Sequence, residues 1–598
     1  MNADQLSRRD AVKILGAAGA AAALPGPHTG GMVADAIAAA GRAPVEILPL
    51  SSTSEVFIPP RGQSYNTFSF DFPEPSVEFD GFRFGFIVFT DANAYALDPA
   101  KMTATTTGDA MTITANGFTW AGGQEQTGGS LTARFRKVGT TVEWDTTVEM
   151  AQPIKTVSTI IRGIPRGRVG FGGPGAGTPD YDEMLAGYPF SGGDLFGGNT
   201  AGGMATPLAI VTTPDGSCVS IGTLDTMVCT KRFFLQPGDQ GYRVEAIAEA
   251  PAWNQQKRWQ VPRWRIMRTA SVDAAVQAHH EYLDRTYRLK KWDERTDVPA
   301  WMRKVALVTT LHGQHFTGFI FNDYAKQLEI LRWMATRIPA DRVLVFLPAW
   351  DGRYYWDYPN YQPSDRLGGA AGFRRLIDEA HQLGFRMMPM FGTNAANRRQ
   401  PMFSRVADAV VHKVDGDVVD LNWVDWDNDR HQEGWAAYMN LGVDSWRRWL
   451  SGRIDEMITR YGVDAYFLDI VGGHINSRNG DMHAGTRRLV MDLRAKHPDV
   501  PCVGEMAYDA LVEFIPMFQV GLGRMGRYSK HFQHLSSPAP GRGSSGVHES
   551  GFGRFDPDTL SLAPDAIPTL QVVDDTFTKH RDAMAAIIQR AKERAGIA

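Results

Sequence analysis

Residues 461–474, YGVDAYFLDIVGGH, and residues 497–509, HPDVPCVGEMAYD, each contain a short apolar run that leads into an acidic residue. Residues 465–468 and 500–503 have the length and the β-branched or aromatic content of fully buried strands. A helical pattern over 482–496 separates the two runs. This stretch therefore predicts a β-α-β unit, around which the remaining chain is organised.

The two acids that end these runs are Asp469 and Glu505. In barrels and open α/β sheets the carboxyl edge of the strands is where ligands bind and reactions occur. Two carboxyl groups on successive parallel strands can lie close enough for one to attack an anomeric carbon while the other protonates the leaving oxygen. The pair therefore predicts a retaining glycoside hydrolase. The competing interpretations are a helix N-cap for Asp469 and a salt bridge at the rim for Glu505.

From residue 299 onward, buried strands alternate with amphipathic helices. Five β-α repeats are clear and three are fainter, which predicts a (β/α)₈ barrel over 299–598 in an α/β fold. A doubly wound open sheet is the alternative, but the chain lacks its glycine-rich first turn. The remaining expected strands are 305–311, 343–347, 386–391, 514–520, 546–549 and 567–573, and the remaining expected helices are 323–335, 372–383, 446–461 and 576–594.

The stretch from 45 to 270 has short alternating segments broken by Gly, Pro, Asp and Asn, which predicts an antiparallel β-sandwich domain. Its expected strands are 67–72, 82–89, 111–115, 131–138, 142–150 and 208–213. The glycine-rich region 170–203 has no strand or helix periodicity and is expected to be a long ordered loop. A helical pattern over 271–287 begins a linker that extends to residue 298.

The amino terminus carries Arg8 and Arg9 before an alanine-rich apolar run over 14–24 that is too short to span a bilayer. It resembles a twin-arginine export signal, although that pattern commonly has Phe and Leu where this chain has Ala11 and Val12. The resemblance implies that residues 1–40 are an export signal and a mature tail. A periplasmic or secreted location, with no membrane anchor after signal removal, is expected.

Composition narrows the classes of partner. The 598 residues carry a net charge of −4 and no basic run, which argues against a nucleic-acid or anionic-membrane surface.

The three cysteines, Cys218, Cys229 and Cys502, have no metal-binding spacing, and we expect no cofactor and no metal. Cys218 and Cys229 could pair across a hairpin, but three buried thiols are the favoured interpretation. Asp425, Asp427 and Asp429 alternate as in calcium loops, yet the segment lacks the Gly and Glu of an EF-hand.

The fourth expected strand ends GVDAYFLDI and follows YMNLGVDSWRRWLSGRIDEMITRYGVD. Together with the expected sandwich and linker, this resembles the retaining α-glycosidase superfamily. Endo-α-N-acetylgalactosaminidase-like and α-amylase-like members place a nucleophilic Asp after strand four and an acid/base Glu after strand five, which implies these roles for Asp469 and Glu505. Amylases have Arg where this chain has Phe467, which favours the galactosaminidase-like or another branch. Melibiase-like relatives place the acid/base on strand six.

Further side chains on the same face are candidates for sugar contacts. The loop 348–369, PAWDGRYYWDYPNYQPSDRLGG, is dense in aromatic rings that can stack on pyranose faces and in Asp and Arg that can bind hydroxyls, although a self-packed loop is the alternative. We expect a nearby imidazole, His474, to hydrogen-bond Asp469, and desolvation to raise the pKa of Glu505. The candidate substrate-binding residues are Trp350, Asp351, Tyr355, Trp356, His312, Asn394, His474, His548, Glu549 and Asp574.

The expected substrate is an oligosaccharide, a polysaccharide or a glycoconjugate. Two other functions remain open. A non-catalytic carbohydrate-binding barrel would hold the two carboxyl groups far apart or in salt bridges. A sugar-modifying enzyme such as a polysaccharide lyase would need a Tyr or His base and an Arg or metal facing the uronate, and no basic cluster lies near the strand ends.

Overall fold

The computed structural model describes the following residues, with only the backbone of the first two segments: 46–49, 55–58, 74–120, 123–171, 184–189, 204–238, 241–315, 317–420, 435–519, 530–535, 566–573 and 576–598. The expected strand 67–72 lies outside them. Among the described residues, no helix has the length and apolar character needed to cross a membrane.

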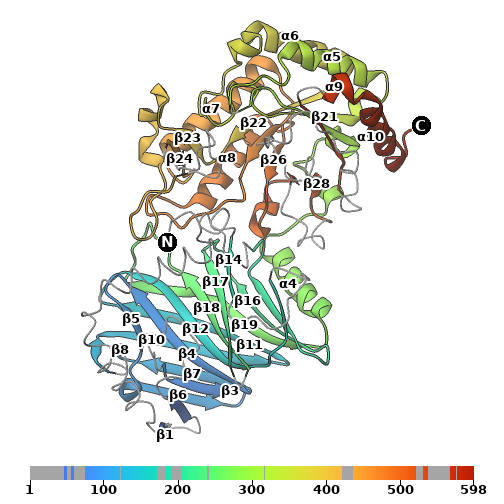
Figure 1. Ribbon diagram of the computed structural model, residues 1–598. Helices are drawn as coiled ribbons and strands as arrows, with labels where there is room; N and C mark the ends of the chain where they lie inside the picture. Colours follow the sequence, from blue (N-terminus) through green and yellow to red (C-terminus); the bar gives the residue numbers. More distant parts are fainter. Residues whose placement is uncertain are drawn as a thin grey trace, which may run out of the picture.

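Two antiparallel sheets form the N-terminal part of the described chain, at the end opposite the barrel in Figure 1. The first follows the order β1 (Glu46–Pro49), β2 (Glu55–Ile58), β3 (Ser76–Phe79), β4 (Phe82–Thr90), β12 (Ile154–Ile164), β18 (Gly241–Glu249), β17 (Lys231–Gly238) and β14 (Met184–Tyr188), with β5 (Ala94–Leu97), β8 (Phe118–Trp120) and β9 (Glu125–Thr127) joined beside β4. The second follows the order β13 (Arg168–Phe171), β15 (Leu208–Thr212), β16 (Cys218–Leu224), β19 (Arg258–Thr269), β11 (Thr141–Met150), β10 (Gly129–Val138), β7 (Ala110–Ala115) and β6 (Met102–Thr107).

Aromatic side chains pack one sheet against the other. The ring of Phe84 on β4 lies 4.7 Å from that of Phe135 on β10 and 5.4 Å from that of Trp144 on β11, measured between centroids. Phe233 on β17 meets Trp264 on β19 at 5.5 Å. All of these rings are buried, so apolar burial holds the two sheets together. The three cysteines are buried free thiols, as the favoured interpretation predicted.

One expectation in this region is wrong. Within the glycine-rich region 170–203, Met184–Tyr188 forms β14, which pairs antiparallel with β17 along Met184–Leu235 to Tyr188–Lys231. The segment MLAGY has a β-compatible composition, but the surrounding glycines conceal it from a periodicity search. This segment becomes a strand because its backbone pairs with the edge strand β17, which a local sequence pattern does not reveal.

Eight parallel strands form the C-terminal sheet, and the predicted barrel is confirmed in nearly closed form. Its closing contact is the parallel bridge between Leu535 and Ile567, next to the last strand. The strands are β20 (Leu307–Leu311), β21 (Val343–Leu347), β22 (Arg386–Gly392), β25 (Tyr466–Asp469), β26 (Cys502–Glu505), β27 (Met517–Gln519), β28 (Gln533–Leu535) and β29 (Thr569–Val572).

The seventh strand differs from the prediction. Gln533–Leu535 occupies that position, parallel to β27, whereas 546–549 was expected there. The segment QHL is short and polar, so it offers no apolar signal. Residues 546–549 lie outside the described residues.

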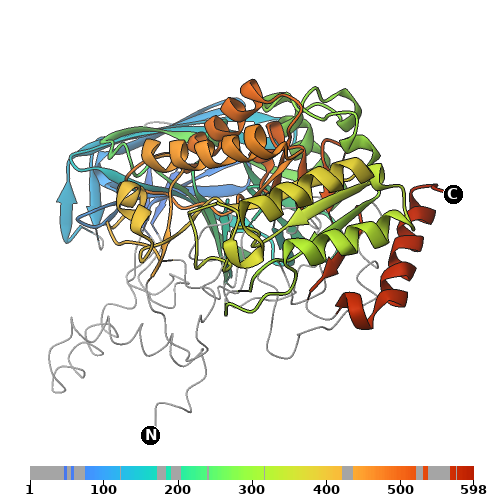
Figure 2. The same ribbon diagram turned by 90° about the horizontal axis from the view of Figure 1, so that it is seen from above.

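Helices cover the outside of the barrel, as Figure 2 shows from above. Several begin at a capping residue: the side chains of Ser271, Asp323 and Asp481 each accept a backbone N–H of the first turn. The expected closing helix 576–594 is divided at His580 into two helices. The helices are α4 (Val272–Thr286), α5 (Tyr324–Ala335), α6 (Gly369–Leu383), α7 (Asp444–Tyr461), α8 (Met482–Lys496), α9 (Thr576–Lys579) and α10 (Arg581–Arg594).

Buried hydrogen bonds join the N-terminal sheets to the barrel. The Tyr188 hydroxyl donates to Asp509 Oδ1 at 2.5 Å, and the Thr206 hydroxyl donates to Asp509 Oδ2 at 2.8 Å. Asn476, in the loop after β25, donates to the carbonyl of Ala250 at 2.9 Å. Since Asp509 follows β26, the sheets contact the loops that leave the carboxyl ends of the barrel strands.

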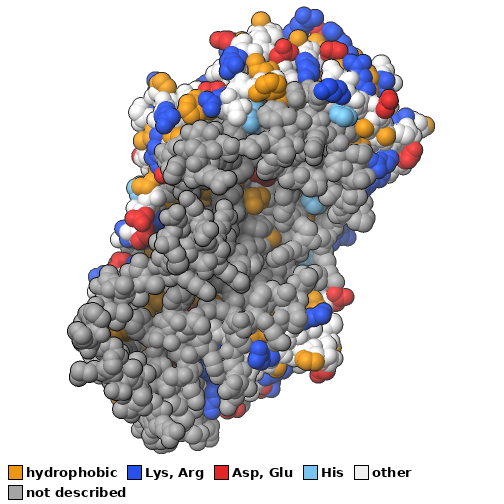
Figure 3. Space-filling model, in the orientation of Figure 1, with side chains coloured by type: hydrophobic (Ala, Val, Ile, Leu, Met, Phe, Trp, Pro, Cys, Tyr) orange, Lys and Arg blue, Asp and Glu red, His pale blue; other side chains and the backbone are white. Residues whose placement is uncertain are grey.

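Charged side chains of both signs are interspersed over the helices at the barrel end, in the view of Figure 3. This agrees with the small net charge of −4.

Candidate active site

Asp469 and Glu505 lie side by side at the carboxyl ends of adjacent strands. β25 and β26 pair in parallel, with Leu468 opposite Gly504, so each strand delivers its terminal acid to the same mouth of the barrel. The N–H of Ile470, the residue after Asp469, donates to Glu505 Oε2 at 3.0 Å, so the two carboxyl groups are close neighbours. Asp469 is buried, whereas Glu505 is partly exposed. The structure thus brings together the two acids that end the strands predicted from the sequence.

Two tyrosines from the loop after β21 hold Asp469. The Tyr355 hydroxyl donates to Asp469 Oδ2, and the Tyr354 hydroxyl approaches the same oxygen at 3.5 Å. The rings of these tyrosines lie edge to face, 4.5 Å apart. Phenol donors stabilise the ionised form of a carboxylate. Both phenols engage Oδ2, so Oδ1 is the oxygen that neither phenol holds.

The surroundings of the two acids raise the pKa of Glu505 more strongly than that of Asp469. Burial raises the pKa of Glu505 well above its usual range, and the adjacent Asp469 carboxylate raises it further. Burial also raises the pKa of Asp469, but hydrogen bonds from Glu505, Tyr355 and Tyr354 oppose that rise. Of the pair, Glu505 is therefore the member that keeps a proton and Asp469 the member that ionises first.

The backbone beside both acids is strained. Ile470 and Met506, the residues immediately after Asp469 and Glu505, have φ values of 52° and 60°, and Tyr355 has a φ of 56°. For non-glycine residues this left-handed region costs of order 1–3 kcal/mol each. A β-branched residue such as Ile470 is an outlier there. Such strain persists only where the surrounding structure imposes it, and here it surrounds the two acids.

Tight contacts and hydrogen bonds fix this arrangement. The Ile470 N–H donates to Glu505 Oε2 at 3.0 Å, and the Gly472 N–H donates to the Glu505 carbonyl at 3.1 Å. A Cβ atom on Gly472 would lie 2.7 Å from Met506 Cβ. The loops after the two strands therefore touch so closely that only glycine fits between them.

The aromatic loop 348–369 divides into a buried part and a surface part. Trp350 is fully buried, donates its ring N–H to the Met390 carbonyl at 2.9 Å and packs against Phe373. Asp351 is also buried, and burial raises its pKa well above the usual range. Tyr355 is buried against Asp469. These residues fit the alternative of a self-packed loop more closely than a row of exposed sugar-stacking rings.

Trp356 is the aromatic residue of the loop that is half-buried, whereas its other aromatic rings are buried. Its half-buried ring meets Trp435 edge to face at 4.8 Å. The Arg353 guanidinium lies 4.2 Å from the ring centroid and that of Arg399 lies 5.6 Å away. Gln400 donates to the Trp356 carbonyl at 2.9 Å, which fixes the backbone. The guanidinium groups beside this half-buried ring are donors of the kind that bind sugar hydroxyls.

The remaining described candidates are buried side chains at the mouth of the barrel. His312 comes directly after β20, with its ring 5.5 Å from that of Tyr354, and so reaches the aromatic cluster around Asp469. Asn394 comes after β22, and its carbonyl accepts the Met439 N–H at 2.9 Å. Both are 3% exposed or less.

His474 is placed differently from the expectation. No hydrogen bond joins its imidazole to Asp469 among the described residues; the phenols of Tyr354 and Tyr355 serve as donors to that carboxylate instead. The His474 ring faces Tyr508 at 6.4 Å. Burial lowers the pKa of His474 to about 4, so the imidazole is neutral near pH 7.

Three substrate-binding candidates, His548, Glu549 and Asp574, lie outside the described residues. The acidic run of Asp425, Asp427 and Asp429 lies outside them as well.

Sequence reasoning missed the residues that fix the acids from behind. Thr393 donates its hydroxyl and its N–H to the Asp469 carbonyl, and Trp446 on α7 donates to the Thr393 carbonyl at 2.7 Å. Gln519 at the end of β27 accepts the Met506 N–H at 2.8 Å. Each position is a consequence of strand order, since Thr393 and Gln519 end or follow the strands on either side of the pair. No local motif distinguishes them.

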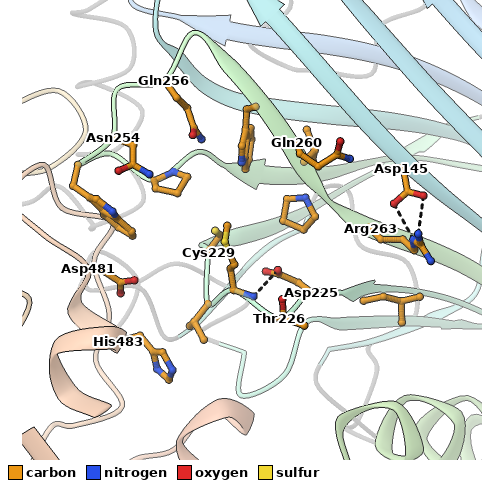
Figure 4. Close-up of a pocket in the computed structure, with 18 of the residues that line it drawn as sticks. Asp145, Asp225, Thr226, Cys229, Asn254, Gln256, Gln260, Arg263, Asp481 and His483 are labelled. Atoms are coloured by element: carbon orange, nitrogen blue, oxygen red, sulfur yellow. Dashed lines mark hydrogen bonds and ion pairs between the residues drawn. The ribbon is translucent and has the colours of Figure 1, made fainter. Parts of the chain in front are cut away.

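A separate cavity of about 910 Å³ lies between the N-terminal sheets and the barrel (Figure 4). Asp225, Asn254 and Gln256 line it from the sheets, and Asp481 and His483 line it from the barrel. Asp225 is already paired with the buried Lys231. Asp469 and Glu505 are not among the lining residues, so this cavity is distinct from the mouth where the two acids meet.

Comparisons with known proteins were made by family, by sequence and by structure. No family model matches the chain, and no curated protein matches it by sequence. The ligand-free α-N-acetylgalactosaminidase NagBb from Bifidobacterium bifidum superposes with a TM-score of 0.63 at 14% identity, over 92% of each chain. Its Gal-NHAc-DNJ complex superposes with a TM-score of 0.58 at 14% identity, over 80% of this chain and 78% of that one.

A GH36 α-galactosidase, AgaA from Geobacillus stearothermophilus, is more distant, with a TM-score of 0.49 at 11% identity over 89% of this chain and 77% of that one. At identities this low, similarity speaks for the fold alone. The superposition on NagBb extends over nearly the whole chain. The protein thus has the fold of a chain described as an α-N-acetylgalactosaminidase, which agrees with the fold that the sequence resemblance implied.

Proposed function

We propose that this protein is a retaining glycoside hydrolase that cleaves α-linked sugars, with Asp469 as nucleophile and Glu505 as general acid/base. The observation that carries the proposal is a pair of neighbouring carboxyl groups, of which Glu505 has its pKa raised well above the usual range by burial and Asp469 has the rise from burial opposed by hydrogen bonds. Phenol donors favour an ionised Asp469, while burial beside that charge keeps Glu505 protonated. These are the states that the first step of the reaction requires.

In the proposed reaction, Asp469 Oδ1 attacks the anomeric carbon, since Oδ2 is held by Tyr355 and Tyr354. The bond from that carbon to the leaving oxygen breaks, and the oxygen takes the proton of Glu505. The Glu505 carboxylate then removes a proton from water, which attacks the glycosyl carbon and releases Asp469. The Ile470 N–H stabilises the Glu505 carboxylate between the two steps.

Retention is supported by the short separation of the acids. Inverting enzymes keep their carboxyl groups roughly 6.5–9.5 Å apart to accommodate a water molecule, whereas retaining enzymes keep them about 5–5.5 Å apart. The two carboxyl groups of this chain are close neighbours, since the Ile470 N–H beside Asp469 donates to Glu505 Oε2 at 3.0 Å, and this proximity supports the retaining arrangement.

The choice of Glu505 over an acid on the sixth strand is supported by the residues after β27. That strand ends at Gln519, an amide, and residues 520–529, VGLGRMGRYS, contain no Asp or Glu. A melibiase-like acid/base on strand six therefore has no carboxyl group to provide it. Strand five supplies the acid/base in the arrangement proposed here.

The proposed substrate is an α-linked N-acetylgalactosaminide or a related α-galactoside on an oligosaccharide, polysaccharide or glycoconjugate. The support is the fold of NagBb, described as an α-N-acetylgalactosaminidase, over 92% of this chain. Trp356, with Arg353 and Arg399 beside it, is the proposed surface for the substrate at the outer edge of the site.

The test is proton NMR of the first-formed anomer from a panel of aryl α- and β-glycosides. We expect hydrolysis of an aryl α-N-acetylgalactosaminide or α-galactoside, with the α-anomer of the free sugar appearing first. A β-anomer appearing first would contradict retention. Binding of these sugars without hydrolysis would instead support the non-catalytic carbohydrate-binding alternative.

We also propose export by the twin-arginine route, on the support of Arg8, Arg9 and the apolar run 14–24. These residues lie outside the described part of the chain. Fractionation of cells that express the full chain should recover it outside the cytoplasm, and Arg8→Lys with Arg9→Lys should retain it inside. Equal distribution of the two proteins would contradict this route.

A further inference from the structure

Two imidazoles and a carboxylate converge where helix α4 meets the barrel. His280 and Asp284 are one helical turn apart on α4, and His531 comes from the segment before β28. His280 Nε2 lies 3.3 Å and His531 Nε2 lies 2.7 Å from the same oxygen, Asp284 Oδ1. One ligand atom from each residue falls within 4.8 Å of the others. Among the described residues, this is the one group of three or more such side chains that converge in this way.

We propose that His280, Asp284 and His531 form a binding site for one divalent metal ion, with Zn²⁺ as the best fit. Neutral imidazole nitrogen and carboxylate oxygen are both zinc ligands, and metal-to-ligand bonds of about 2.0–2.2 Å place tetrahedral ligands about 3.4 Å apart. The spacings of 3.3 Å and 2.7 Å from Oδ1 are within a small side-chain adjustment of that value. Water would complete the fourth position, toward the half-buried edge at Asp284.

The surroundings of His531 fit the outer shell of a metal site. Its Nδ1 lies 2.9 Å from the Lys290 carbonyl, so Nδ1–H donates there, and a metal ion that displaces the proton from Nε2 would meet the Nε2 lone pair between Asp284 and His280. A backbone acceptor on the distal nitrogen is the arrangement that orients metal-bound histidines. The His531 carbonyl in turn accepts the Arg295 guanidinium at 3.2 Å, which fixes the backbone of this residue.

The two oxygens of Asp284 have different partners. Oδ1 faces both imidazoles, whereas Oδ2 accepts the Lys530 ammonium at 2.9 Å. A carboxylate can bind a metal through one oxygen while its second oxygen accepts an outer hydrogen bond. The Lys530 charge opposes metal binding, but its side chain is 46% exposed, so solvent screens that repulsion.

A second histidine, carboxylate and lysine group in the same chain provides a matched comparison. His497 Nε2 lies 2.6 Å from Asp455 Oδ1, and Lys496 Nζ lies 2.5 Å from Asp455 Oδ2. This group has the imidazole, the carboxylate and the ammonium, but no second imidazole among the described side chains that contact it. It is an ordinary surface ion pair, and it distinguishes metal binding from simple charge pairing.

The role that the position suggests is a cross-link. α4 packs on the second antiparallel sheet and connects it to the barrel, while His531 lies just before the barrel's seventh strand. One ion would therefore join the linker helix to the barrel. Because the ion binds the folded chain, it would raise stability by mass action without taking part in the reaction.

The test uses the untagged full chain, stripped with a chelator and titrated with ZnCl₂ by calorimetry. We expect one Zn²⁺ per chain, and at least a roughly 100-fold loss of affinity in Asp284→Asn and in His531→Gln. His497→Gln should bind Zn²⁺ as the unchanged chain does. Absence of saturable binding, or equal binding by Asp284→Asn, would overturn the site.

X-ray absorption at the zinc edge gives a second measurement that needs no variant. The loaded chain should show two imidazole ligands with oxygen in the remaining positions. A zinc shell with fewer than two imidazoles would overturn the assignment. The thermal midpoint of the chain should also rise when Zn²⁺ is added and return when it is chelated, with no such change in Asp284→Asn.

Discussion

The backbone N–H of Ile470 donates to Glu505 Oε2 at 3.0 Å, so the residue immediately after one acid holds the carboxyl group of the other. Ile470 takes up its left-handed conformation at this contact. The two acids are therefore coupled through the main chain as well as through their side chains. A change that moves either strand end should alter both roles at once.

Substitution of the acids should separate their roles. We expect Asp469→Asn to lower kcat/KM by about 10⁴-fold, since the nucleophile is lost. Glu505→Gln should lower it by about 10²–10⁴-fold, and less for an aryl glycoside whose leaving group needs no proton. Initial rates on a nitrophenyl glycoside and on a disaccharide measure the difference. Glu513→Gln, which removes a surface partner of Arg487, is the matched control. Wild-type activity in Asp469→Asn would contradict the assignment.

Loss of a phenol donor should shift the pH profile. Tyr355 donates to Asp469 and lowers the pKa of that carboxyl against the effect of burial. In Tyr355→Phe the pKa of Asp469 rises, so the acidic limb of kcat/KM against pH should move to higher pH. Tyr361→Phe is the control, because that hydroxyl bonds the Gly392 backbone. An unmoved acidic limb in Tyr355→Phe would show that this phenol does not tune the nucleophile.

The two tryptophans of the aromatic loop should behave differently. Trp356→Ala removes a half-buried ring between two guanidinium groups, so we expect a higher KM with little loss of stability. Trp350→Phe removes a buried N–H donor to the Met390 carbonyl, which should cost about 1–3 kcal/mol of unfolding free energy. Steady-state kinetics and urea unfolding check the pair. A large stability loss in Trp356→Ala would assign that ring to packing.

Asp509 should make stability depend on pH. Burial raises the pKa of its carboxyl from 3.8 to about 6 in the folded protein. The folded chain therefore binds this proton more tightly than the unfolded chain, and the associated stability is complete below pH 3.8 and declines as pH rises through about 6. The decline is of order 3 kcal/mol. Asp509→Asn should lose this slope, although it also loses a hydrogen bond. Urea unfolding at pH 4 and pH 7 measures both, and an unchanged slope would contradict the pKa.

Two glycines should respond in opposite ways to a methyl group. Gly472→Ala places a Cβ 2.7 Å from Met506 Cβ and 2.8 Å from the Met506 carbonyl carbon, so we expect a loss of about 1–3 kcal/mol and reduced activity. Gly452→Ala on helix α7 has open space around the new Cβ. It should gain about 1 kcal/mol from helix propensity. Thermal unfolding with activity assays distinguishes them, and an active, stable Gly472→Ala would show that these loops can separate.

The sequence predicted elements best where local signals agree. Helix α8 begins and ends at the residues that the pattern indicated, because Asp481 caps an apolar-periodic run. The two acids were found because each ends a buried strand. The sequence did not predict strand β28, because QHL is too short and too polar to give a strand pattern. It forms a strand by pairing with the edge of β27.

Contacts between distant segments were beyond sequence reasoning. The aromatic density of residues 348–369 was evident, but the burial of Tyr355 against Asp469 depends on how the loop folds back over the barrel. The convergence of His280, Asp284 and His531 has the same cause. Its third member lies far along the chain from the helical pair, so no spacing rule connects them.

The bond from Tyr188 to Asp509 has a consequence for how this protein could be divided. Asp509 is four residues beyond Glu505, yet the hydroxyls that satisfy its buried oxygens come from Tyr188 and Thr206. A barrel that begins at residue 299 would keep Asp469 and Glu505 but would lose Tyr188 and Thr206. The Asp509 carboxylate, and the turn between Glu505 and Asp509, would then be exposed to water. Exchange of this barrel for another of the same fold should therefore succeed only when the segments that carry Tyr188 and Thr206 are transferred with it.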